Sequence, residues 1–301
     1  MIESIGIVVL NWNQQALTRE CIGSIRNSDF KNYKIFLLDN GSRQGEWEEF
    51  STPCEDIIFI RNEENLGFAR GANIGITAAM EYGCDYLFLL NNDTLIDPLC
   101  LSEMMKHWAV DETVGVITPK ILQYDRRDTL FAAGGRLIKS LGQPLLRGLN
   151  EKDRGQYDKN ETVTFASGCA MLIKVSVIRE IGMFYEDFFA YAEDMDLCSR
   201  VSKQNYKMLY IPTAKVWHKF AGSTGVESPL FYYLHTRNRM IFAKRNNVFL
   251  VYFFAFMPFF ILYRVLYLIT RLLMTKRFSQ AKAVFKGFVW HINKKWGQMT
   301  F

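Results

Sequence analysis

Three short polar motifs in the 301-residue chain carry side chains that suit metal binding or proton transfer. The first is Asn91-Asn92-Asp93, which directly follows the apolar run at 86–90. A carboxylate such as that of Asp93 gives a hard divalent cation an oxygen ligand, and the phosphates of a substrate can supply others. Asn and Asp are also common turn residues, so the motif is equally compatible with a simple turn after a strand.

The second motif, AYAEDMDLC, places Glu193, Asp194 and Asp196 at the start of a helix predicted over 193–204. Acidic side chains at this end of a helix interact favourably with its dipole and its free N–H groups. A carboxylate at the mouth of a substrate crevice can instead serve as a general base toward a hydroxyl group. The residues alone leave both roles open.

The third motif, VWHKFAGSTG, contains His218 between a strand-like segment and a loop rich in Gly and Ser. A single histidine is often a hydrogen-bonded structural residue. Together with Asp93 it would form a mixed nitrogen and oxygen site of the kind that Mn²⁺ accepts. The sequence contains no G-x-S-x-G, Walker A or H-E-x-x-H motif, which argues against serine hydrolase, P-loop and zincin activities.

The segments that must position these motifs alternate between short apolar runs and stretches of helical periodicity. This alternation predicts an α/β fold with a mostly parallel central sheet between layers of helices. Ligands of such sheets bind beyond the carboxyl ends of the strands, and here those ends carry short polar side chains. The predicted strands are 5–10, 34–39, 57–61, 86–90, 169–174 and 207–212. The predicted helices are 17–25, 72–80, 175–182, 193–204 and one that begins at Asp97-Pro98.

The charge of the chain is distributed unevenly along its length. The net charge is +5, yet residues 228–301 contain 12 Lys and Arg and no Asp or Glu. The rest of the chain therefore has 24 basic residues against all 31 acidic ones, a net charge of −7. An acidic body with a basic, aromatic-rich tail indicates a molecule in two parts.

The six cysteines are scattered without a C-x-x-C pair, which is typical of reduced thiols in the cytosol. The apolar run near the N-terminus is too short for a signal peptide, so we expect no export.

Taken in order, the motifs resemble those of the family 2 glycosyltransferases of the GT-A fold. The greatest similarity is to the bacterial rhamnosyltransferase-like branch that builds cell-surface polysaccharide. The resemblance spans residues 5–240 and implies a GT-A nucleotide-diphospho-sugar transferase domain over 1–245, followed by a hydrophobic helical extension over 246–301. The matching segments are IVVLNWN, LLDNGS, NEENLGFARGANIG, LFLLNNDT, ASGCAMLIK, EDMDLC and VWHKFAGSTG, with YYLHTRNRM after them.

The resemblance also implies a role for individual residues. Asp194 matches the catalytic base, and Asp93 and His218 match ligands of a divalent metal, Mg²⁺ or Mn²⁺. Gly168, Cys169 and Glu193 fall on the acceptor side. The residues that match the binding site of a nucleotide-diphosphate sugar donor are Asn11, Asn13, Asp39, Asn65, Gly67, Arg70, Asn73, Asn91, Asn92 and Arg237.

The mechanism that the resemblance implies is a single displacement that inverts the anomeric carbon. Asp194 would remove a proton from an acceptor hydroxyl, and the metal would neutralise charge on the leaving nucleotide diphosphate. The sequence departs from the family pattern at Asn91, which replaces the first Asp of the D-x-D motif. It departs again at Arg43-Gln44, where the usual turn carries an acid, so we do not assume a UDP-linked donor.

The tail has 16 residues without a charge, 248–263, before Arg264 and Arg271 interrupt its apolar run. A membrane-spanning helix needs about 20 apolar residues. We therefore expect a helix or helical hairpin that lies in the cytoplasmic leaflet of the inner membrane, attracted by anionic lipid. A saccharide acceptor carried on a polyprenyl lipid would suit this location. The alternative is that these helices cover a domain face or a homodimer interface.

Two other functions compete with sugar transfer. A basic aromatic tail prompts nucleic-acid binding, but its cations flank one continuous apolar run instead of alternating with aromatic residues, so we expect no nucleic-acid partner. A catalytically inactive binding partner with the same fold is the other alternative. The presence of Asp93, Asp194 and His218 argues against it.

Overall fold

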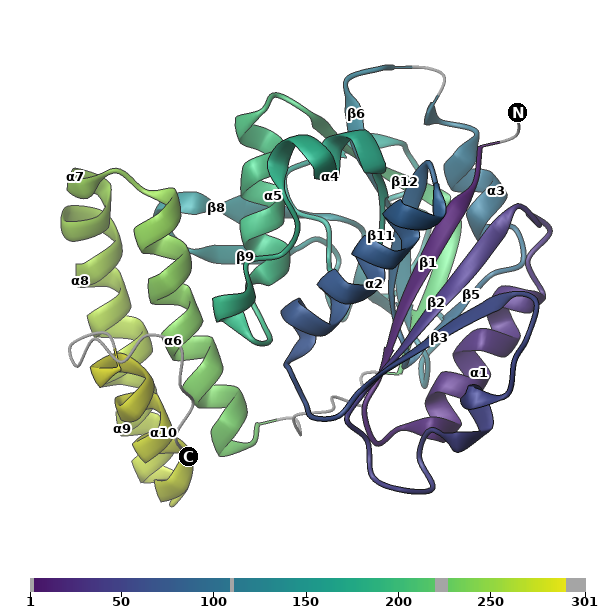
Figure 1. The fold of residues 1–301 in the computed structure, drawn as a ribbon. Coiled ribbons are helices and arrows are strands. Elements are labelled where there is room, and N and C mark those ends of the chain that lie inside the picture. Colours follow the sequence, from purple (N-terminus) through teal and green to yellow (C-terminus); the bar gives the residue numbers. More distant parts are fainter. Residues whose placement is uncertain (1–2, 109–110, 220–226, 291–301) are drawn as a thin grey trace.

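A ten-stranded mixed sheet forms the centre of the molecule, with eight of its strands in the order β10-β12-β6-β11-β4-β1-β2-β3. The computed structural model describes residues 3–108, 111–219 and 227–290 (Figure 1). Helices cover the sheet, and three further helical segments stand beside it at the left of Figure 1. The predicted α/β architecture is therefore confirmed.

Four parallel strands form the half of the sheet that the N-terminal part of the chain builds, as the sequence predicts. Most of their apolar residues are buried, because the sheet is covered on both faces. Burial on both faces explains why each strand is an almost continuous hydrophobic run rather than an alternating one. The strands are β1 (Ile5–Asn11), β2 (Tyr33–Asn40), β3 (Ile57–Asn62) and β4 (Tyr86–Asn91).

Helices α1 (Gln15–Arg26) and α2 (Phe68–Tyr82) cover opposite faces of these strands. Ile22 of α1 belongs to one hydrophobic cluster, together with the alternate residues of β1 that face it. Ile76 of α2 belongs to the other cluster, with the β1 residue Val8 and its neighbours on that face. The period of two along a strand separates the two clusters.

The other half of the sheet contains β6 (Val114–Gln123), a ten-residue strand that the periodicity did not predict. Pro119 in its centre argues against a central strand, because proline has no N–H to donate. The partner strand β12 (Lys207–His218) accommodates this proline with a register shift between Ile211 and Lys215, directly beside it.

The remaining strands run in mixed directions. β11 (Ala170–Lys174) is antiparallel to both β4 and β6, so β4, β6 and β12 all end at the same edge of the sheet. The short strands are β5 (Thr94–Ile96), β7 (Leu130–Ala132), β10 (Glu161–Val163) and the separate hairpin of β8 (Gly135–Ile138) and β9 (Gln143–Leu146).

Most predicted helices of the body lie where we expect them, with one shift. Helix α3 (Cys100–Met105) begins two residues later than the Asp97-Pro98 signal suggests, because Asp97 Oδ1 accepts the N–H of Leu99 (3.0 Å) in a turn that precedes the helix. The other helical segments of the body are α4 (Val175–Ile181), α5 (Glu193–Lys203) and the single turns η1 (Glu48–Ser51), η3 (Lys139–Leu141) and η4 (Glu186–Phe188).

The C-terminal part forms helix α6 (Pro229–Asn246) and a helical hairpin that packs against it (Figure 1). The first arm of the hairpin is a continuous 26-residue helix, Phe249–Met274, and the second is α10 (Phe278–Val289). Among the described residues, this first arm is one helix that is long and apolar enough to cross a membrane. The first arm comprises α7 (Phe249–Val251), η5 (Tyr252–Phe256), α8 (Met257–Phe259), η6 (Phe260–Tyr267) and α9 (Leu268–Met274).

Candidate active site

A cavity of about 310 Å³ lies at the sheet edge where β4, β12 and the start of α5 meet. It is lined in part by aromatic side chains that the sequence did not single out, among them Trp12, Phe131, Tyr191 and Phe231. Half of the site residues predicted from the sequence also line this cavity: Asn91, Asn92, Asp93, Gly168, Cys169, Glu193, Asp194 and His218.

Strand pairing brings Asp93 and His218 together, although 125 positions of sequence separate them. The Asn91-Asn92-Asp93 motif turns the chain from β4 into β5. Strand β5 pairs antiparallel with the end of β12, so that Thr94 lies opposite His218. Asp93 Oδ1 is then 3.2 Å from His218 Nε2. Both side chains are more than nine-tenths buried. The edge of the Phe131 ring packs against the imidazole, with the two ring centres 4.9 Å apart.

This pair fits two ligands of one divalent cation. Metal–ligand bonds of about 2.1 Å leave adjacent ligand atoms roughly 3 Å apart, which matches the separation of the carboxylate and the imidazole. The described residues contain no group of three or more His, Cys, Asp and Glu side chains arranged around one point. A metal held here would thus complete its coordination with water or substrate oxygens, as Mg²⁺ does when it binds through phosphates.

Asp194 lies at the first turn of α5, with its carboxylate held by backbone amides. Its Oδ2 accepts the N–H of Gly168 (3.1 Å) and its Oδ1 accepts the N–H of Met195 (2.8 Å). A Cβ atom at Gly168 would lie only 3.1 Å from Asp194 Cβ, so this position requires a residue without a side chain. Burial raises the pKa of Asp194, and the two amide hydrogen bonds oppose that effect.

Glu193 is the second buried carboxyl group of the cavity. Burial, followed by the charge of Asp194, raises the pKa of Glu193 to about 8. Its Oε2 has no hydrogen-bond partner among the described residues. Two adjacent carboxyl groups of this kind share protons and titrate as a pair. A pair that titrates near neutral pH is suited to general acid–base chemistry. The Cys169 thiol nearby is inert by comparison, because burial raises its pKa to about 12.

The segment before α5 has a strained backbone, and side chains of α6 hold it in place. Phe189, Tyr191 and Ala192 all have φ between +62° and +73°, which is costly for residues with a side chain. Asn238 donates its amide hydrogens to the carbonyl groups of Phe188, Ala190 and Tyr191 at 2.7 to 2.8 Å. No pattern in the sequence marks Asn238, because an amide in a helix is unremarkable until its partners are known.

Arg237 contributes to the same restraint. Its guanidinium donates to the carbonyl groups of Asp187 (2.7 Å) and Phe188 (2.9 Å). The described contacts thus place Arg237 behind the cavity wall, and it is not among the cavity-lining residues.

Asn11, Asn13 and Asp39 form a second polar group next to the cavity. Asn11 donates to Asp39 Oδ1 (2.9 Å), and Asn13 accepts the N–H of Arg43 (2.8 Å). Arg61 lies with its Nε 3.6 Å from Asp39 Oδ2 and its guanidinium over the ring of Trp47. Trp12 and Gln14, which flank Asn13 in the sequence, line the cavity, so the two groups are neighbours.

The predicted donor residues around α2 lie outside the cavity lining. Asn65 accepts the N–H of Gly67 (2.8 Å) before α2 begins, and a Cβ atom at Gly67 would collide with Phe189. Asn73 bonds both the N–H and the carbonyl group of Phe184. The half-exposed side chain of Arg70 has its Nε 3.7 Å from Glu186.

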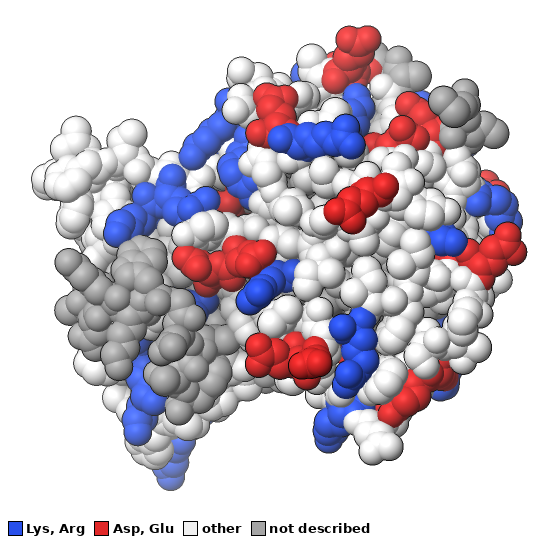
Figure 2. Space-filling model, viewed as in Figure 1, with Lys and Arg blue, Asp and Glu red and all other residues white. Residues whose placement is uncertain are grey.

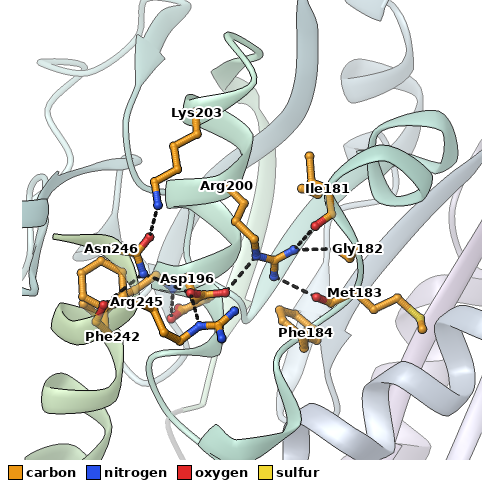
Figure 3. Close-up of polar contacts among 12 residues, drawn as sticks. Ile181, Gly182, Met183, Phe184, Asp196, Arg200, Lys203, Phe242, Arg245 and Asn246 are labelled. Carbon is orange, nitrogen blue, oxygen red and sulfur yellow. Dashed lines mark hydrogen bonds and ion pairs between the residues drawn. The ribbon is translucent and has the colours of Figure 1, made fainter. Parts of the chain in front are cut away.

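Asp196, the third acid of the second motif, does not line the cavity and lies instead in the polar network that Figure 3 shows. It is 1% exposed and accepts hydrogen bonds from Arg200 (2.9 Å), Arg245 (3.3 Å) and Asn246 (3.1 Å). Arg200 also donates to the carbonyl groups of Ile181, Gly182 and Met183, as Figure 3 shows. This network joins α5 to the end of α6 and to the loop after α4.

Comparisons with known proteins identify the family and the fold. The model of glycosyl transferase family 2 matches residues 6–182, more than half of the chain. The low-salt glycan biosynthesis hexosyltransferase of Haloferax volcanii is 26% identical over 256 residues, which cover 83% of this chain and 78% of that protein. The N-acetylglucosaminyl-diphospho-decaprenol L-rhamnosyltransferase of Mycobacterium tuberculosis is 22% identical over 265 residues, which cover 82% and 86%.

Two solved structures share the fold at 14% sequence identity. The first is a mannosyltransferase from Pyrobaculum calidifontis in complex with GDP-Man and Mn²⁺, with a TM-score of 0.57 over 97% of this chain and 87% of that one. The second, GalNAc-T7 with UDP, GalNAc and Mn²⁺, has a TM-score of 0.63 over 97% of this chain and 56% of that one. The predicted GT-A fold is confirmed, and the chain belongs to glycosyl transferase family 2 as a glycosyltransferase.

Proposed function

We propose that this enzyme transfers a sugar from a nucleotide-diphosphate donor to a hydroxyl group of a cell-surface polysaccharide or lipid-linked oligosaccharide, with inversion at the anomeric carbon. The observation that carries this proposal is the pairing of two sites across one cavity: Asp93 with His218 on one side, and Glu193 with Asp194 on the other. A rhamnosyl donor is the specific candidate, and the similarity to a rhamnosyltransferase supports it.

The chemistry divides between these two sites. Asp194 removes the proton from the acceptor hydroxyl as that oxygen attacks the anomeric carbon, and the two backbone amides fix the direction of its carboxylate. Asp93 and His218 would hold Mg²⁺ or Mn²⁺, which would supply positive charge to the departing nucleotide diphosphate. Asn91 and Asn92, on the same turn, add neutral polar contacts to the donor.

The group around Asp39 is the proposed site of the nucleotide. Asp39 and Asn13 offer hydrogen-bonding groups to a base or a ribose, and the Trp47 ring beside them, stacked on Phe59, offers a flat apolar surface. Asn11 holds Asp39 in place. Arg70, with the half-exposed guanidinium at the start of α2, is suited by shape and charge to a phosphate group.

The helical tail, residues 246–301, is the proposed membrane-associating part. Figure 2 shows acidic side chains over the body, whereas the helices at the left of the view present uncharged and basic ones. The exposed apolar side chains of its first arm include Phe249, Phe254 and Met274, each at least 70% exposed. Such a surface is typical of a membrane or protein contact. The tail is basic and contains no Asp or Glu. This composition favours contact with an anionic lipid surface on the cytoplasmic side of the cell membrane over a dimer interface.

The experiment that tests the function uses the full chain with a panel of nucleotide sugars and a lipid extract as acceptor. We expect one donor to release nucleotide diphosphate in the presence of Mn²⁺ and to lose this activity in EDTA. Asp93→Asn should lose it as well, whereas the matched variant Asp97→Asn, directly after the end of β5 and outside the cavity, should retain it. Release of nucleotide diphosphate that persists in EDTA would refute the metal role of Asp93 and His218. Inactivity with every donor would favour a catalytically inactive binding partner.

A further inference from the structure

A cluster of three cationic or ionisable side chains lies between the cavity and the helical tail. His235 and Arg239 are one helical turn apart on α6, so they lie on the same face as Phe231, one turn earlier. Arg264 of the first tail arm lies near enough for its charge to act on His235 and for the charge of Arg239 to act on it, and its neighbour Val265 belongs to the same hydrophobic cluster as Met240 of α6. Burial, followed by the charges of Arg264 and Arg239, holds the pKa of His235 well below its usual value.

The described contacts provide no anion for this cluster. Neither Arg239 nor Arg264 has an ion pair with any Asp or Glu, and every acidic residue of the chain falls within the described ranges. Arg264 Nε is buried without a hydrogen-bond partner there. By contrast, Lys120, which is 2% exposed, pairs with Asp153 (2.8 Å) and Asp158.

Cations without a counter-charge in this setting indicate a missing anionic ligand. Arg239 and Arg264 are partly buried. An unpaired charge that is partly withdrawn from water costs stability, and a bound anion would reduce that cost. Two guanidinium groups provide planar sets of donors that match the oxygens of a phosphate or a carboxylate group.

The position of the cluster restricts what the anion belongs to. The His235 ring contacts Phe231 and Tyr191, with ring centres 4.1 and 4.4 Å apart, and both aromatic residues line the cavity. On its other side, the cluster adjoins the exposed apolar helix Phe249–Met274. A ligand bound here would therefore have one end in the sugar-transfer cavity and the other along a surface suited to hydrocarbon chains.

We propose that Arg239 and Arg264 bind the phosphate or diphosphate group of a lipid-linked acceptor. The acceptor sugar would reach the cavity past His235, Tyr191 and Phe231, and the lipid chain would follow the first tail arm into the membrane. This inference rests on the proposed function, which supplies the acceptor class. It adds the residues that recognise the anionic group of that acceptor.

A binding experiment with the full chain in neutral detergent and EDTA tests this assignment without requiring sugar transfer. The probes are farnesyl diphosphate, farnesol and inorganic pyrophosphate. We expect farnesyl diphosphate to bind and raise the melting temperature, and farnesol to do neither. Arg239→Gln and Arg264→Gln should each weaken the binding of farnesyl diphosphate about tenfold, the effect of losing one charge-assisted contact. Arg271→Gln, an exposed cation on the same arm, is the matched control and should bind as the wild type does.

The outcomes separate the possible sources of the anion. Equal binding by wild type and both variants, equal binding of farnesol, or an equal loss in Arg271→Gln would each overturn the assignment. Pyrophosphate that binds as tightly as farnesyl diphosphate would exclude a lipid ligand. Sedimentation with phosphatidylglycerol vesicles should be unchanged in the two variants, and a parallel loss would identify a general headgroup site instead. Because removing an uncompensated cation relieves repulsion, neither variant should melt below the wild type. A failure of sugar transfer would leave these binding results intact.

Discussion

One turn of helix α5 carries three carboxyl groups that meet opposite environments. Asp196 is enclosed by two guanidinium groups and an amide, whereas Glu193 and Asp194 face the cavity and form no ion pair with a Lys or Arg among the described residues. Asp194 and Asp196 are two positions apart, which turns their side chains about 200° from each other around the helix. The same acidic cluster therefore supplies chemistry on one face and structural attachment on the other.

The same contrast holds for the cations of the tail. Arg245 ends in the Asp196 network, while Arg239, six positions earlier on α6, lacks an ion pair among the described residues. The charged groups of Asp196, Arg200 and Arg245 that join α5 to α6 are paired with one another. Glu193 Oε2 in the cavity and Arg264 Nε near it have no hydrogen-bond partner among the described residues. An incompletely paired buried group costs stability, so its presence at a cavity is a physical reason to expect a ligand or a reaction there.

The largest expected effect is on the cavity side of the comparison. Asp194→Asn should lower kcat for sugar transfer about 10³-fold, because the amide cannot accept the hydroxyl proton. The variant should melt within a few degrees of the wild type, since an amide oxygen can still accept the Gly168 N–H. Steady-state rates and thermal unfolding check this. Full activity in a folded Asp194→Asn protein would transfer the role of base to Glu193.

The second effect is on the structural side. Asp196→Asn should reduce the free energy of unfolding by about 2 kcal/mol, because two partly exposed guanidinium groups lose the buried carboxylate that they share. The protein that remains folded should keep its kcat. Urea denaturation of this variant beside Asp194→Asn measures the difference between two chemically identical changes on one helix. Similar losses of stability in both would remove the distinction between the two faces.

The third effect is the pH dependence that Glu193 imposes. Its pKa in the folded protein, about 8, lies above the ordinary value near 4.5, so the folded state holds the proton more tightly. That contribution to stability is complete below about pH 4.5 and is lost as the pH rises through 8. In EDTA, the wild type should lose on the order of 2 kcal/mol between pH 5 and pH 8. Glu193→Gln should lose distinctly less over this range, and an equal loss would contradict the assignment.

The sequence predicted the four parallel strands and the residues at their carboxyl ends because burial on two faces leaves a clear apolar run. It could not predict β6, since Pro119 is tolerated only through the register shift in β12, a property of the partner strand. The pairing of Asp93 with His218 also depends on a long-range strand contact. The residue types therefore suggested a mixed metal site only as one possibility, and the family resemblance was needed to assign it. The roles of Asn238 and Arg239 could not be predicted from the sequence, because the role of each depends on segments that are distant along the chain.

The smallest expected effect comes from adding a carboxylate to either side of the comparison. Asn91→Asp restores an acid on the cavity rim and should lower the Mn²⁺ concentration for half-maximal thermal stabilisation about threefold, since an added negative charge attracts the cation. Asn246→Asp places the same charge beside Asp196, where it should alter the melting temperature and leave the Mn²⁺ response unchanged. Titration of both variants with Mn²⁺ measures whether the metal belongs to the cavity face alone. A Mn²⁺ response that shifts equally in both would mean that the cation acts by general screening and that the Asp93–His218 pair is only structural.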